Sequence, residues 1–145
     1  MKKTLFILVL AVAMLSCGDN DDDSNDQCGT QLIIDADRYQ SIEDPGQPIF
    51  IINSNIIDEC LSLTLGFSGC DDDHTIELIT DGAVAESFPV QVFFKLEDLN
   101  PQLCQAYFEK VYEYDLDELD DLLGSEPSAR LIFPQMEEEV LWDRE

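Results

Sequence analysis

Apolar and polar residues alternate along much of the chain after residue 30, which is the pattern of β-strands with one buried face. The strictest alternation covers 60–67, and 90–97 repeats it with valine, phenylalanine and leucine at every second position. The apolar positions of the first run are Leu61, Leu63, Leu65 and Phe67. Shorter runs rich in β-branched or aromatic residues are also predicted strands, at 32–34, 49–52, 75–79, 106–114, 131–133 and 140–142.

Turn-forming residues separate these runs, at Asp44-Pro45-Gly46, Ser68-Gly69, Asp81-Gly82, Asn100-Pro101 and Gly124-Ser125. One short helical segment is predicted at 115–123, with Asp115 as its N-cap and Glu118 reaching back to it. Seven or eight short strands with one helical turn predict an all-β domain, a two-sheet antiparallel β-sandwich. A small β-barrel is the alternative.

The first sixteen residues have the three parts of an export signal. Lys2 and Lys3 precede an unbroken apolar run, 5–15, which as a helix spans about 16 Å and is too short to cross a bilayer core. Met14-Leu15-Ser16-Cys17 resembles a lipobox, so we expect cleavage before Cys17 and lipid attachment to its thiol. The alternative is an ordinary secreted protein in which this cysteine is incidental.

The segment 17–27 contains five aspartates, no base and no bulky apolar residue, which predicts an extended acidic tether rather than a folded element. It lacks the glycine and the glutamate of an EF-hand loop. The expected organisation is a signal peptide at 1–16, a lipidated tether at 17–27 and a single β-rich domain at 28–145. We expect this domain to be anchored on the outer membrane and exposed at the cell surface, with the periplasmic face as the alternative.

The net charge of the chain limits the classes of molecule that it is expected to bind. The chain has 32 acidic and 7 basic residues, a net charge of −25, and loss of Lys2 and Lys3 with the signal leaves −27. Such a field repels nucleic acid and anionic lipid headgroups, so neither is an expected partner. Contact with a membrane is expected through the lipid anchor, and an unknown protein or cation remains as a partner.

Beyond Cys17, the chain has four cysteines, Cys28, Cys60, Cys70 and Cys104, and an even number in an oxidising compartment predicts two disulfides. A Cys60–Cys70 bridge is disfavoured, because ten strand residues span about 30 Å and a disulfide needs Cα atoms within about 7 Å. Two pairings remain, and Cys28–Cys60 with Cys70–Cys104 is favoured because its two loops are of comparable size. A zinc site is disfavoured by the lack of a C-x-x-C pair.

The single histidine, His74, follows three aspartates, Asp71, Asp72 and Asp73. These four residues are weak candidates for a calcium site, and a solvated loop tip is the favoured interpretation. Ser68 is the nearest serine, but its surroundings lack the second glycine of a G-x-S-x-G elbow. We therefore expect no catalytic residue, no metal and no cofactor.

Five motifs in order give the region 60–119 a resemblance to uncharacterised bacterial lipoproteins and secreted proteins of the Bacteroidota type. They are Ser68-Gly69-Cys70, His74-Thr75-Ile76-Glu77-Leu78, Ser87-Phe88-Pro89-Val90-Gln91, Leu103-Cys104-Gln105-Ala106 and Tyr114-Asp115-Leu116. The resemblance implies a Cys70–Cys104 bridge and assigns no activity. The acidic run after Cys17 is likewise similar to the surface-export signal of Bacteroidota lipoproteins.

These observations favour a lipid-anchored, non-enzymatic binding or accessory module of unknown ligand. The alternatives are an envelope hydrolase that uses paired carboxylates and a calcium-binding surface domain.

Overall fold

The computed structural model describes residues 28–42, 49–133 and 139–144. The predictions for the signal peptide, the lipidated Cys17, the tether at 17–27 and the turn Asp44-Pro45-Gly46 lie outside these residues. Within the described residues, no helix is long and apolar enough to cross a membrane.

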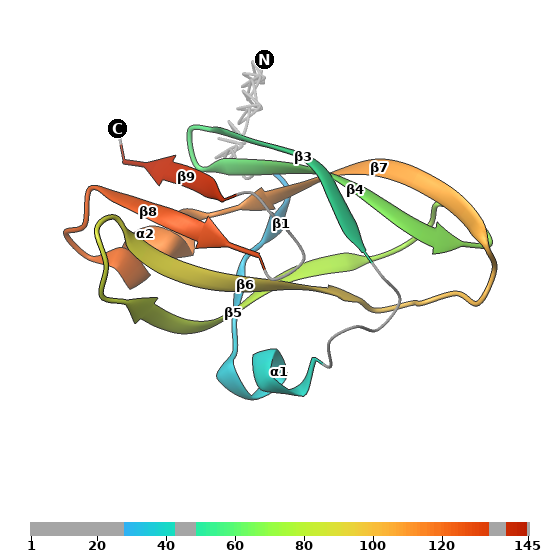
Figure 1. The fold of residues 1–145 in the computed structure, drawn as a ribbon, viewed down its shortest axis with the longest axis horizontal. Helices are drawn as coiled ribbons and strands as arrows, with labels where there is room; N and C mark the ends of the chain where they lie inside the picture. Colours follow the sequence, from blue (N-terminus) through green and yellow to red (C-terminus); the bar gives the residue numbers. More distant parts are fainter. Residues whose placement is uncertain (1–27, 43–48, 134–138, 145) are drawn as a thin grey trace, which may run out of the picture.

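The described chain folds into two sheets that pack face to face, with two short helices (Figure 1). The strands of the four-stranded sheet, in spatial order, are β1 (Thr30–Gln31), β7 (Ala106–Asp115), β4 (Cys60–Gly69) and β3 (Phe50–Ile57). Those of the five-stranded sheet are β2 (Ile33–Ile34), β5 (Ile76–Ala85), β6 (Val90–Asp98), β8 (Ser128–Ile132) and β9 (Val140–Asp143). The predicted β-sandwich is confirmed, and the described strands form no closed barrel.

Both sheets of the sandwich are mixed and not antiparallel throughout. The long neighbours β4 and β7, β3 and β4, and β5 and β6 are antiparallel, but β1–β7, β2–β5 and β6–β8 are parallel pairs. β1 lies in the four-stranded sheet and β2 in the five-stranded sheet, and a single residue, Leu32, separates them. This short connection links the two sheets. Parallel pairing needs a crossover between the strands, and α2 lies in the crossover from β7 to β8.

The core lies between the sheets and follows the predicted alternation. Leu61, Leu63, Leu65 and Phe67 of β4 are at most 1% exposed, and they face the buried residues of β6 across the sandwich. Burial of each such side chain contributes about 1.5–3 kcal/mol. The buried positions of β6 are Val90, Val92, Phe94 and Leu96.

Two predicted turns are instead parts of strands. Ser68-Gly69 ends β4 and stays paired with β7, through Ser68 with Tyr107 and Gly69 with Ala106. Asp81-Gly82 lies inside β5, where the pairing with β6 shifts register between Thr80 and Val84 and Gly82 has a φ of 77°. Asp81-Gly82 therefore lies in a bulge of β5, where extra residues interrupt the pairing without ending the strand.

The predicted helix exists as α2 (Asp117–Leu123), and Leu116, Leu119 and Leu123 are buried as expected. Its predicted capping box is wrong, because Leu116 occupies the N-cap position and makes no side-chain cap bond. Asp115 is the last residue of β7, and its carboxylate accepts a hydrogen bond from the Asp117 amide at 3.0 Å.

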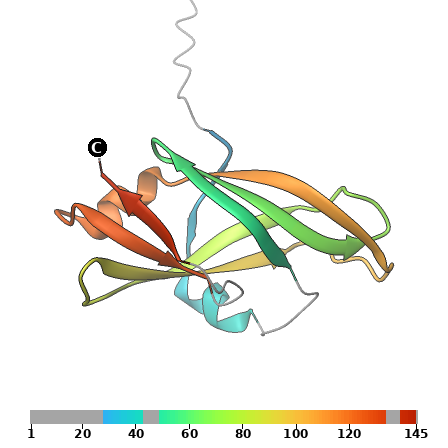
Figure 2. The same cartoon turned by 45° about the horizontal axis from the view of Figure 1, so that its top comes forward.

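A second helix, α1 (Ala36–Ser41), was not predicted. It lies on the outer side of the five-stranded sheet, away from the other sheet (Figures 1 and 2). It buries no residue, so its sequence lacks the apolar periodicity from which a helix is predicted. Ion pairs from Arg38 to Glu77 of β5 and Glu97 of β6 hold it on the sheet. Lys95 adds bonds of 3.0 Å to the carbonyl oxygens of Tyr39 and Ile42.

Candidate functional site

Two disulfides close the ends of β4. Cys28 pairs with Cys60 at a Cα separation of 5.7 Å, and Cys70 pairs with Cys104 at 4.8 Å. These are the favoured bridges. In the chain-entropy model, loops of 32 and 34 residues each contribute about 3–4 kcal/mol of stability. Together they fix both ends of the strand on which the sheet is built.

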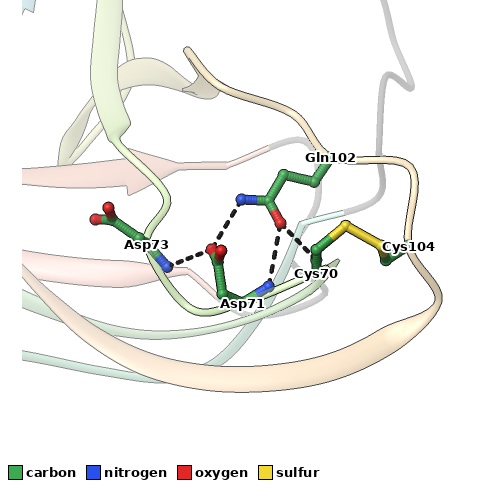
Figure 3. The surroundings of a disulfide bond; sticks show 5 residues. All are labelled: Cys70, Asp71, Asp73, Gln102 and Cys104. Carbon is green, nitrogen blue, oxygen red and sulfur yellow. Dashed lines mark hydrogen bonds between the residues drawn. A yellow bond between two sulfur atoms is a disulfide. The ribbon is translucent and has the colours of Figure 1, made fainter.

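The side chain of Gln102 holds the start of the loop after Cys70 (Figure 3). Its amide oxygen accepts hydrogen bonds from the backbone N–H groups of Cys70 and Asp71, at 2.5 and 3.1 Å, and its amide nitrogen donates to the Asp71 carboxylate at 2.8 Å. The Asp71 carboxylate also accepts from the Asp73 amide. The hydrogen bond from Gln102, and to a smaller extent that from the Asp73 amide, lowers the pKa of Asp71. The loop is therefore a rigid cap on this end of the sandwich.

His74 is a buried structural residue and not a solvent-facing one. Its side chain is fully buried, and Nδ1 lies 2.6 Å from the carboxylate of Asp98, whose side chain is 7% exposed. Its ring packs against that of Phe67, with the ring centres 4.6 Å apart and the ring planes tilted by 46°. Its backbone carbonyl accepts a bond from the hydroxyl of Tyr112, whose pKa is raised to about 12 by burial and then by nearby acids.

The other ring nitrogen of His74, Nε2, has no hydrogen-bond partner among the residues that the structure describes. It faces the backbone of Gly69, so closely that a Cβ added to Gly69 would stand 2.4 Å from it. That glycine is part of the Ser68-Gly69-Cys70 motif, and its lack of a side chain leaves the space that the imidazole needs. The nitrogen is therefore covered by backbone and does not open onto a ligand site.

The four candidate calcium ligands do not converge. The Asp71 carboxylate is engaged by Gln102, and His74 points inward to Asp98. The Asp72 backbone carbonyl accepts a bond from Lys110, which brings a cation to this loop. Among the described residues, no group of three or more His, Cys, Asp or Glu side chains is placed to hold a metal ion.

Two carboxyl groups, that of Glu59 in the turn after β3 and that of Asp117 of α2, are within hydrogen-bonding reach of each other. The hydrogen bond to Asp117, followed by burial and by the charges of nearby aspartates, raises the pKa of Glu59. Burial also raises the pKa of the adjacent Asp115. Both Glu59 and Asp117 are solvent-exposed.

An exposed apolar patch covers part of the outer face of the four-stranded sheet. At its centre, Gly66 of β4 pairs with Phe50 of β3, and the Tyr107 side chain of β7 lies over it against Ile52. Val111 lies one residue pair farther along the same face, opposite Thr64. We call Phe50, Ile52, Tyr107 and Val111 the outer patch, and these side chains are 48–55% exposed.

The outer patch was not predicted, although the sequence contains a weak signal for it. In β7 the inward positions Phe108 and Tyr112 alternate with outward ones, and two of the outward positions, Tyr107 and Val111, are apolar as well. These outward apolar residues of β7 indicate a binding surface only once β3 is known to lie two strands from β7 in the same sheet. Outward apolar residues on separate strands form a patch only when the strands are neighbours in one sheet.

No family model matches the chain, and no curated protein matches it. Among solved structures, it is similar to a protein of unknown function DUF1344 from Bacteroides vulgatus, with a TM-score of 0.52 and 12% identity over 79% of this chain and 55% of that one. It is also similar to a protein from Parabacteroides distasonis provisionally described as toxin-related, with a TM-score of 0.46 and 16% identity over 79% and 59%. The chain thus spans just over half the length of each. The first likeness shows a shared fold and no activity.

Proposed function

We propose that this chain is a lipid-anchored protein of the outer membrane whose domain binds another protein through the outer patch, without catalysis. The single observation that supports binding is the patch itself. Four large apolar side chains, each about half exposed, lie on a sheet face that no other described element covers, and Tyr107 and Ile52 meet over Gly66. Contiguous apolar surface on a monomer is typical of an interaction site, whereas scattered exposed residues are not.

The arrangement suits a flat, rigid binding surface. The patch lies on β3, β4 and β7, which are paired along their lengths, and β4 is fixed at both ends by disulfides. Tyrosine and phenylalanine provide large contact areas at low conformational cost, so a partner can gain affinity from few residues. The lipid on Cys17 would hold this surface at the membrane.

The proposal is tested by a photo-crosslinking amino acid placed at Val111 in the native cells. Leu141 of β9 is the matched control, since it is 54% exposed against 55% for Val111 but lies on the other sheet. We expect a discrete protein adduct from position 111, lost when Phe50→Ser is added, and no such adduct from position 141. Equal labelling from both positions, or an adduct indifferent to Phe50→Ser, would refute a binding role for the patch.

A further inference from the structure

Two carboxylates stand on the face that holds the outer patch. Glu109 pairs with Gly66 at the centre of the patch, between Tyr107 and Val111, and Glu113 follows opposite Ser62. Both glutamates are exposed. The outward positions of β3 and β4 are uncharged, so these two acids are the exposed charges on the paired face of the three long strands, and both are negative.

Among the described residues, no basic side chain of the protein neutralises either glutamate. The chain has only five lysines and arginines after residue 16, and each is engaged elsewhere. Arg38, Arg130 and Arg144 pair with other acids, and Lys95 and Lys110 donate to backbone carbonyls. The negative charge of the patch is therefore available to a partner.

The aromatic rings of the patch also lack a cation that similar rings in this protein possess. Lys95 lies 4.6 Å from the ring centre of Tyr39, Lys110 lies 5.7 Å from that of Tyr112, and Arg144 lies 5.6 Å from that of Trp142. Within the described part of the chain, Tyr107 and Phe50 have no such neighbour. A cation over an exposed ring contributes about 0.5–1 kcal/mol, and more when water is excluded.

From this complementarity we infer that the outer patch recognises a basic protein segment, one that presents arginine or lysine beside apolar residues. This inference rests on the proposed function and specifies the chemistry of its partner. A guanidinium stacked on Tyr107 or Phe50 can bond to Glu109 at the same time, while apolar neighbours cover Val111 and Ile52. A polyanion or an acidic protein would be repelled by the same face.

The test uses the full chain carrying Cys17→Ser, which stays free of lipid, and a ten-residue peptide of alternating arginine and valine as the probe. Titration calorimetry compares Glu109→Gln/Glu113→Gln with Glu86→Gln/Glu118→Gln, which removes the same charge from exposed sites in the β5–β6 connection and α2. We expect the first variant to weaken binding about five- to twentyfold and the control less than about twofold. Spermine, a cation with no apolar side chain, should bind both variants alike.

Equal weakening in the two double variants would overturn the inference, because it would mean that the peptide follows the overall charge. Discrimination by spermine as strong as by the peptide would also overturn it, since a protein segment would not be needed. Neither result would change the outcome of the crosslinking test at Val111. The proposal about the partner's chemistry can therefore be refuted while the proposal of a binding face still stands.

Discussion

Replacement of Gly69 by alanine should destabilise the domain severely, because this residue leaves the space occupied by the buried imidazole of His74. The new Cβ would stand 2.4 Å from His74 Nε2 and 2.9 Å from the backbone oxygen of Asp71. Neither group can move away freely. The imidazole is fully buried against Phe67 and bonded to Asp98, and the Asp71 segment is clamped by Gln102 and the adjacent disulfide.

The expected loss of stability combines two effects. Overpacking of a rigid core costs about 1–3 kcal/mol, and displacement of His74 from the buried Asp98 carboxylate costs about 1.5–3 kcal/mol more. A total of about 2.5–6 kcal/mol corresponds to a fall in Tm of about 10–24 °C for a domain of this size. Thermal and urea unfolding followed by circular dichroism would measure both quantities.

Gly66→Ala is the matched control, since it makes the same substitution three residues earlier in β4. Its Cβ would meet the Tyr107 hydroxyl at 2.2 Å, but that is the far end of an exposed side chain that can swing aside. We expect a loss below about 1 kcal/mol. Equal destabilisation by the two alanines would refute the reasoning, and so would a Gly69→Ala variant as stable as the wild type.

Four other outcomes are expected. Because the folded state raises the pKa of Glu59 above its ordinary 4.5, protonation of Glu59 favours folding, and this contribution is complete at low pH and lost as pH rises through the raised pKa. Glu59→Gln should therefore raise the stability of the domain at pH 7 by less than about 1 kcal/mol and leave it unchanged at pH 4. An equal gain in stability at both pH values would contradict the pairing of Glu59 with Asp117. Arg38→Met should leave two carboxylates without their cation, cost about 1–2 kcal/mol and speed amide exchange across α1, whereas unchanged exchange would show that α1 is held by other contacts. Cys17→Ser should abolish metabolic lipid labelling, so continued labelling would exclude the lipoprotein assignment. Added protease should cleave the domain on intact cells, and replacement of the aspartates at 21–23 by alanine should hide it without loss of lipid; resistance of the wild type until the outer membrane is opened would place the domain in the periplasm.

The sequence by itself determined the local elements whose pattern is strong. Strict alternation identified β4 and β6, because successive side chains of a strand point to opposite faces and one face is buried. Leu116 at the N-cap of α2, with Leu119 and Leu123 inside it, was likewise predicted to form a buried face. The distance across β4 excluded a Cys60–Cys70 bridge, which left two pairings, and the favoured one is present. These conclusions needed only the geometry of one segment at a time.

The tertiary structure decided everything that depends on which segments are neighbours. Alternation gives a strand two faces but does not name its partners, so the parallel pairs of β1, β2 and β8 could not be predicted. His74 followed three aspartates in sequence, yet its partner is Asp98, 24 residues away on β6. The outer patch joins Phe50 to Tyr107 across β4 for the same reason. A site assembled from distant strands has no local pattern, because its residues meet only through the pairing of the sheet.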